Sequence, residues 1–133
     1  MPPPPLNGLL EVAIYVDDIA TSVAFYLRVL GFEVIYDGDR LSALGVAGRQ
    51  VLLICHRTAS ADLPLIAHDA EGQQHIAFAV SMADLDAWRE RLDTLGVPIE
   101  HIRDWPRGGR SVYFRDPDGH LLELATPGVW SIY

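Results

Sequence analysis

Residues 111–126, Ser-Val-Tyr-Phe-Arg-Asp-Pro-Asp-Gly-His-Leu-Leu-Glu-Leu-Ala-Thr, decide the fold of this chain. They predict a strand, a tight turn at 115–119 and a second strand. Pro117 fixes φ in the turn, and Gly119 can adopt a positive φ. The second strand is apolar on both faces but carries Glu123 in its middle. Because burial of an unpaired carboxylate is costly, we expect Glu123 to have a partner elsewhere in the chain.

The order of predicted elements in the second half of the chain repeats that of the first half. The first half predicts a strand at 9–16, a helix that ends near Leu30, and strands at 32–36, 41–46 and 50–55. The second half predicts a strand at 75–80, a helix with the apolar stripe Leu85, Trp88, Leu92 and Leu95, a strand at 97–102, a polar loop at 103–110 and the hairpin of 111–126. Each half is therefore expected to fold as βαβββ.

This repeat predicts the fold class and the division of the chain. A long internal period with matching element order indicates two similar modules. We expect an α+β fold in which two βαβββ modules in tandem form a curved mixed sheet around a shared cavity. The predicted parts of this one compact domain are a disordered proline-rich leader at 1–8, modules at 9–57 and 75–127, a linker at 58–74 and a tail at 128–133. Within the linker, 63–66 (Leu-Pro-Leu-Ile) either packs as a flap or is a plain connection.

Alignment of the two halves places three metal-ligand residues at equivalent positions. Glu11 aligns with His75 on the first strand of each half, and Leu53 aligns with Glu123 on the last strand. Two carboxylates and one imidazole neutralise a divalent cation, and the leucine leaves one coordination position open. Taken singly, each residue has a plainer explanation: Glu11 at the surface, His75 bonded to backbone, and Glu123 paired with an arginine such as Arg110. Their shared equivalence favours a metal site formed by Glu11, His75 and Glu123.

Composition excludes several classes of partner. The 133 residues are half hydrophobic and carry a formal net charge of −8, which argues against nucleic acid or an anionic membrane as the partner. No apolar run approaches the length of a membrane helix. The single cysteine, Cys55, excludes an internal disulfide and favours a reducing, cytoplasmic location.

Several short motifs resemble one known superfamily. They are Tyr-Val-Asp-Asp at 15–18, Ser-Val-Ala-Phe-Tyr at 22–26, Val-Leu-Gly-Phe at 29–32, His-Ile-Ala-Phe at 75–78, Tyr-Phe-Arg-Asp-Pro-Asp-Gly at 113–119 and Leu-Glu at 122–123. The chain resembles the vicinal oxygen chelate superfamily, which includes glyoxalase I, extradiol dioxygenases, fosfomycin-resistance transferases and bleomycin-resistance proteins. This resemblance implies a small-molecule substrate, a divalent metal ion (Fe, Mn, Zn or Ni) and a homodimer.

The resemblance also assigns roles to individual residues. His75 and Glu123 match the family's metal ligands, whereas Glu11 stands where many members have histidine. Leu53 stands where glyoxalase I has a fourth ligand, a glutamate, and this departure counts against glyoxalase I activity. Tyr113 stands where members often have a tyrosine that contacts substrate, so Tyr113 and Glu123 are the expected catalytic residues. A core tyrosine is the alternative for Tyr113.

Other residues are weaker candidates for a role in the site. Arg103, Arg107 and Arg110 border a glycine-containing loop and either meet an anionic substrate or are solvated. Cys55 either lines the cavity or is a buried structural residue. Trp105 and Trp130 either roof the pocket or pack as ordinary aromatics. No spacing ties the remaining histidines together, namely His56, His68, His101 and His120.

The expected function is that of a metal-dependent enzyme whose substrate chelates the metal through vicinal oxygens. Dioxygenase chemistry is the first expectation, and a lyase or isomerase reaction of the glyoxalase kind is the second. The alternative is a metal-free protein that binds and sequesters a drug, as bleomycin-resistance proteins do.

Overall fold

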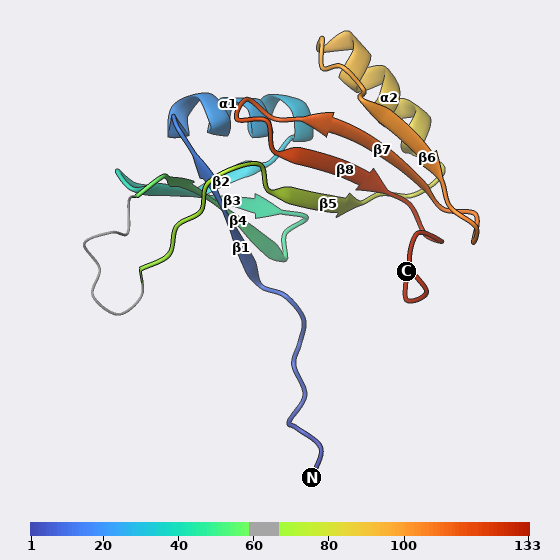
Figure 1. Cartoon of the computed structure of the whole chain (residues 1–133), viewed down its shortest axis with the longest axis horizontal. Coiled ribbons are helices and arrows are strands. Elements are labelled where there is room, and N and C mark those ends of the chain that lie inside the picture. The colour runs from blue at the N-terminus through green and yellow to red at the C-terminus, as the bar shows by residue number, and fades with distance from the viewer. Residues whose placement is uncertain (59–66) are drawn as a thin grey trace. The chain divides into compact units, whose positions relative to one another are not determined.

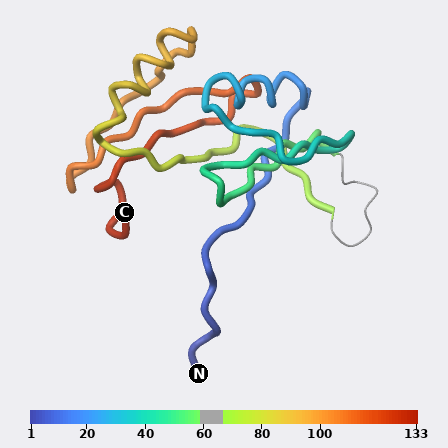
Figure 2. Tube along the Cα trace, turned by 180° about the vertical axis from the view of Figure 1, so that it is seen from behind, coloured from blue at the N-terminus to red at the C-terminus, as the bar shows by residue number. Residues whose placement is uncertain are grey.

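A computed structural model describes residues 1–58 and 67–133 of the chain. Its contacts divide the chain into two compact units, Met1–Glu71 and Gly72–Tyr133. The boundary between the units falls inside the predicted linker, and the predicted flap at 63–66 lies outside the described residues. Residues 1–10 are exposed and carry no helix or strand (Figure 2).

Each unit is a βαβββ module, so the predicted tandem fold is confirmed (Figure 1). The first module consists of β1 (Glu11–Val16), α1 (Ile19–Leu30), β2 (Glu33–Asp37), β3 (Leu41–Val46) and β4 (Gln50–His56). The second consists of β5 (His75–Ala79), α2 (Leu85–Thr94), β6 (His101–Asp104), β7 (Arg110–Arg115) and β8 (Leu121–Ala125). The strand orders are β1-β4-β3-β2 and β5-β8-β7-β6, with the first and last strand of each module parallel.

One face of each sheet forms the core of its module. In the first module Ile14, Leu44, Leu52 and Ile54 are each no more than 2% exposed, and α1 contacts β3 and β4. In the second module the corresponding core residues are Val112, Phe114, Leu122 and Leu124, with Leu85 and Leu92 of α2 also buried. Because side chains alternate along a strand, the opposite face of the first sheet carries Glu11 and Leu53. The opposite face of the second sheet carries His75, Ser111, Tyr113 and Glu123.

Strand register confirms that the two modules are equivalent residue by residue. Glu11 pairs with Val51 as His75 pairs with Leu121, and Ala13 pairs with Leu53 as Ala77 pairs with Glu123. The sequence alignment therefore matched Glu11 with His75, and Leu53 with Glu123, at equivalent positions of the two modules.

Several predicted boundaries were wrong by one to four residues, chiefly around α2. The strand predicted at 97–102 is β6, His101–Asp104, so the loop predicted at 103–110 shortens to 105–109. The reason is that the chain turns tightly after α2: the Val97 amide donates to the Leu92 carbonyl at 2.8 Å, and Pro98 has no amide to pair. At the other end of α2, Ser81 Oγ accepts from the Asp84 amide at 3.1 Å, and the helix begins at Leu85.

Candidate functional site

His75 and Glu123 lie side by side on the open face of the second sheet. β5 and β8 are parallel neighbours, and their register sets the imidazole of His75 beside the carboxylate of Glu123. His75 Nε2 is 3.1 Å from Glu123 Oε1. The Glu123 side chain is only 8% exposed, whereas the His75 side chain is 49% exposed. The partner that the sequence required for Glu123 is therefore His75. The half-exposed imidazole leaves this pair accessible to solvent on one side.

The two atoms of this pair that point away from each other, His75 Nδ1 and Glu123 Oε2, are hydrogen-bonded to other protein groups. His75 Nδ1 lies 2.8 Å from the carbonyl oxygen of Leu121, and since a carbonyl can only accept, Nδ1 carries the proton. Glu123 Oε2 accepts from the Ser111 hydroxyl at 2.5 Å, and Ser111 Oγ in turn accepts from Trp105 Nε1 at 2.8 Å.

The inner atoms of the pair, His75 Nε2 and Glu123 Oε1, face one another: Nε2 donates to Oε1 when the imidazole is protonated, and both atoms are acceptors when it is neutral. With Nδ1 protonated, a neutral imidazole presents the lone pair of Nε2 toward Glu123 Oε1. Two facing lone pairs repel unless a proton or a cation lies with them. One imidazole nitrogen and one carboxylate oxygen are ordinary ligands of zinc, manganese, iron and nickel. The donor set of His75 and Glu123 therefore fits a divalent metal ion.

A metal ion held by His75 and Glu123 would need a third ligand from elsewhere. Neither module supplies, among residues 1–58 and 67–133, three gathered His, Cys, Asp or Glu side chains that would hold a metal by themselves. Glu11 is the exposed first residue of β1, in the other module. Its participation stays a prediction.

Cys55 lies on the same face of the first sheet as Glu11. It is 3% exposed, and burial, with a smaller contribution from the Glu11 carboxylate, raises the pKa of its thiol. A raised pKa keeps the thiol protonated and unreactive. The structure thus agrees with a buried structural cysteine.

Tyr113 lies directly opposite Glu123 in the register of β7 and β8. Its ring stacks on His101 at a centroid distance of 6.2 Å and lies 6.5 Å from the ring of His75. It is only half-buried, unlike the core residues Val112 and Phe114 on either side. Tyr113 therefore belongs to the site face rather than to the core.

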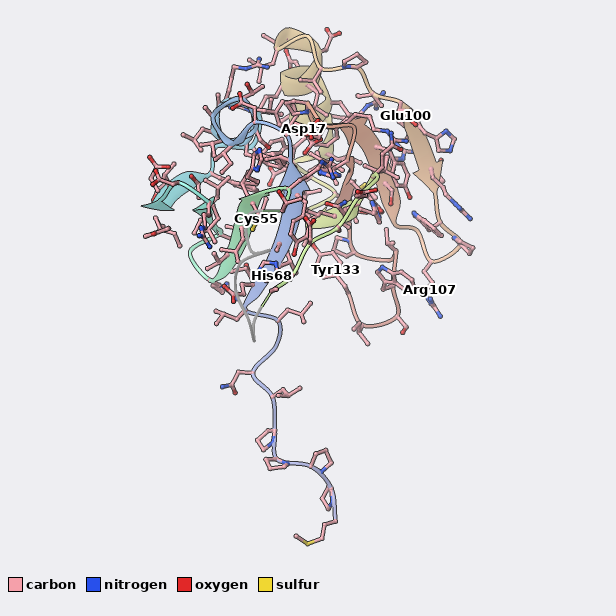
Figure 3. All side chains as sticks on the ribbon, turned by 60° about the vertical axis from the view of Figure 1, so that its left-hand side comes forward. Asp17, Cys55, His68, Glu100, Arg107 and Tyr133 are labelled. Atoms are coloured by element: carbon pink, nitrogen blue, oxygen red, sulfur yellow. The ribbon has the colours of Figure 1, made fainter. Side chains whose placement is uncertain are left out.

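The three loop arginines have different surroundings. Arg110 Nε donates to Asp104 Oδ1 at 2.6 Å, a contact that lowers the pKa of Asp104. The alternative that Arg110 pairs with Glu123 is therefore wrong. Arg103 lies over the ring of Trp105, 3.9 Å from its centroid, and Arg107 is exposed (Figure 3). A contact between these arginines and an anionic substrate stays a prediction.

Sequence reasoning missed two features that the structure shows. Ser111 was not singled out, although it lies two residues before Tyr113 on the same strand and therefore on the same face. In the first module the Tyr15 hydroxyl bonds to Nδ1 of His68, and burial raises the pKa of this tyrosine. No spacing in the sequence indicates the contact between Tyr15 and His68, because Tyr15 lies on β1 and His68 lies in the distant connection between the modules.

His120, one of the histidines without a predicted role, is fully buried, and its Nδ1 accepts from the amide of Gln74 at 2.9 Å. This bond fixes the chain immediately before His75. His120 thus has a structural role beside the site.

Comparisons with known proteins place the chain in a family. A metallothiol transferase FosB from Bacillus licheniformis is 31% identical over 92% of this chain and 77% of that protein. A fosfomycin resistance protein FosX from Listeria monocytogenes is 32% identical over 90% of this chain and 89% of that protein. The crystal structure of a lactoylglutathione lyase from Agrobacterium tumefaciens matches with a TM-score of 0.89 and 34% identity, covering 96% of this chain and 99% of that one. The sequence-family model of the Glyoxalase/Bleomycin resistance protein/Dioxygenase superfamily matches residues 8–124, and the chain belongs to this superfamily.

Proposed function

We propose that the protein is an enzyme that depends on a divalent metal ion and acts on a small molecule bearing neighbouring oxygen atoms. Glu11, His75 and Glu123 are the proposed metal ligands. The observation that carries this proposal is that His75 Nε2 and Glu123 Oε1, two atoms of common metal-ligand types, lie 3.1 Å apart, while His75 Nδ1 and Glu123 Oε2 are bonded to other protein groups. Two protein carboxylates and one neutral imidazole balance the charge of a divalent cation and leave positions for substrate oxygens.

The protein groups around the metal ligands have distinct roles in this proposal. When bound, the metal supplies Lewis acidity that polarises a substrate oxygen. Leu121 holds His75 in the tautomer that leaves Nε2 free to bind a cation. Tyr113, directly opposite Glu123, donates its phenolic proton to an oxygen of the bound substrate.

The names of the relatives support a transferase or lyase reaction. The matched proteins are a metallothiol transferase, a fosfomycin resistance protein and a lactoylglutathione lyase. We therefore place such a reaction, with a thiol as one reactant, ahead of the dioxygenase chemistry that the sequence first suggested. Dioxygenase chemistry stays the second candidate because the matching superfamily includes dioxygenases. Assembly as a homodimer also remains a prediction from the resemblance.

Metal content tests the proposal. Protein purified without a chelating tag is expected to carry a stoichiometric divalent metal by elemental analysis. Glu123→Gln and His75→Ala should each abolish that binding, because each removes one ligand, while the far-ultraviolet circular dichroism spectrum stays that of the folded protein. Glu90→Gln, an exposed change on α2, is the matched control and should bind metal like the wild type.

The outcomes separate the candidate functions. Metal-loaded protein should consume fosfomycin in the presence of a thiol, or form or consume S-lactoylglutathione. Oxygen uptake with a catechol in place of these activities would select the dioxygenase. If the wild type binds no iron, manganese, zinc or nickel but binds a drug tightly, the protein is instead a sequestering protein of the bleomycin-resistance type.

A further inference from the structure

We propose that Trp105 and Ser111 act as positioning residues that hold the Glu123 carboxylate in the orientation required to bind the metal. This inference rests on the proposed metal site, and it assigns a function to two residues that are not ligands. The contacts run in one line: Trp105 Nε1 to Ser111 Oγ at 2.8 Å, and Ser111 Oγ to Glu123 Oε2 at 2.5 Å. Ser111 is fully buried and Glu123 is 6% exposed, so water does not replace these bonds.

The direction of each hydrogen bond is fixed by its chemistry. An indole N–H can only donate, so Ser111 Oγ must accept from Trp105. The single hydroxyl proton of Ser111 is then directed to Glu123 Oε2. With Oε2 held in this way, Oε1 is the oxygen that faces His75 Nε2. On the far side of the pair the Leu121 carbonyl, which can only accept, fixes His75 in the same manner.

The loop that carries Trp105 is tightly closed. The Trp105 amide donates to the Gly109 carbonyl at 2.8 Å, and the Gly108 amide donates to the Trp105 carbonyl at 2.9 Å. Gly109 lies against Gly128 so closely that a Cβ on Gly109 would be 2.2 Å from the Val129 amide nitrogen. The indole ring itself lies under the guanidinium of Arg103. These contacts restrain the loop around Trp105, whose indole nitrogen donates to Ser111.

The first module lacks this arrangement. Ser111 pairs with Ala125 in the second module as Leu41 pairs with Cys55 in the first, and Leu53 corresponds to Glu123. Leucines therefore stand at both positions where the second module has Ser111 and Glu123. At these positions the second module has both the hydroxyl and the carboxylate, and the first module has neither. This is expected if the Ser111 hydroxyl orients the Glu123 carboxylate.

Metal affinity of single and double variants tests the inference. Ser111→Ala should raise the Kd for Mn²⁺, measured by calorimetry, by about 10- to 100-fold, which is typical for loss of a group that orients a ligand. Trp105→Phe should weaken binding in the same direction. The double variant should be no weaker than Ser111→Ala, because Trp105 acts only through the serine. Trp88→Phe, which changes a tryptophan of α2 outside the proposed site, is the matched control and should leave the Kd unchanged.

Two further measurements separate positioning from plain stability. The melting temperature of each metal-free variant reports whether it folds, and the visible absorption spectrum of bound Co²⁺ reports the ligand geometry. A changed Co²⁺ spectrum in folded Ser111→Ala is the expected result. Wild-type Kd and spectrum in Ser111→Ala, or additive effects in the double variant, would overturn the inference while leaving the metal site intact. A wild type that binds no metal would instead overturn the proposed function together with this inference.

Discussion

Glu123 carries a carboxylate in the middle of an otherwise apolar strand, and its two oxygens have different neighbours. Oε2 is bonded to the buried Ser111 hydroxyl, and Oε1 faces the imidazole of His75. A buried carboxylate is tolerated when its lone pairs are satisfied, and here Oε1 lies 3.1 Å from an imidazole nitrogen that donates to it only when the ring is protonated. The proposed metal site gives this charged residue a function in an otherwise apolar strand.

Tyr113 offers a test of chemistry at the level of one residue. Tyr113→Phe removes only the hydroxyl and keeps the ring that stacks on His101. If the hydroxyl donates a proton to the bound substrate, turnover should fall by about 10²- to 10⁴-fold, the usual contribution of a general acid. The metal Kd should not change, because Tyr113 is not a ligand.

The measurement is kcat of the metal-loaded variant beside its metal Kd. Tyr36→Phe, at an exposed tyrosine of β2, is the control and should behave as wild type in both. Full activity in Tyr113→Phe would show that the tyrosine only packs against its neighbours.

At the level of elements, α1 shows how a local sequence signal sets a helix start. Asp18 is the N-cap, and its Oδ2 accepts from the Thr21 amide at 3.2 Å and from the Thr21 hydroxyl. Gly31 ends the helix with a φ of 72°, a conformation that favours glycine. The neighbouring Asp17 is paired with Arg57 at 2.9 Å.

The cap predicts a pH-dependent stability. The bonds from Thr21 lower the pKa of Asp18 from its ordinary value of 3.8. A carboxyl with a lowered pKa stabilises the fold above its ordinary pKa, and that contribution is lost as the pH falls through the lower, folded-state value. Asp18→Ala should therefore lower the melting temperature at neutral pH, and its deficit should shrink in acid below pH 3.8.

Melting curves followed by circular dichroism from neutral to acid pH check this prediction. Asp18→Asn keeps a capping oxygen that does not titrate, so it should lose less stability than Asp18→Ala at neutral pH. An Asp18→Ala deficit that is equal at all pH values would contradict the assigned cap.

At the level of the whole molecule, the internal repeat made the fold predictable from sequence. Apolar periodicity and strand-forming residues located each helix and strand of residues 1–58 and 67–133, and the alignment of 51–54 with 121–124 gave the strand equivalence that the register confirms. Errors arose where chain geometry overrides local preference, as at Pro98, which delays β6.

The site was predictable in part for the same reason. His75 and Glu123 lie on neighbouring strands whose register follows from the repeat, so their contact could be expected. The contact of Ser111 with Trp105 could not be expected from the sequence, because it depends on a loop that closes through the approach of Gly109 to Gly128. Close packing of two backbones leaves no periodic signal in a sequence.

The equivalence of the modules leads to a final prediction, which concerns Leu53. Leu53 pairs with Ala13 as Glu123 pairs with Ala77, so it stands at the first module's counterpart of a proposed ligand. If Glu11, His75 and Glu123 are the metal ligands as proposed, Leu53→Glu should add a fourth ligand and lower the Kd for Mn²⁺ or Zn²⁺ in calorimetry, since each added anionic ligand favours a divalent cation. Leu53→Gln, similar in size but uncharged, is the control and should bind more weakly than Leu53→Glu. An affinity unchanged by the glutamate would mean that the symmetry of the two sheets does not extend to the metal site, and the assignment of Glu11, which rests on the same symmetry, would fall with it.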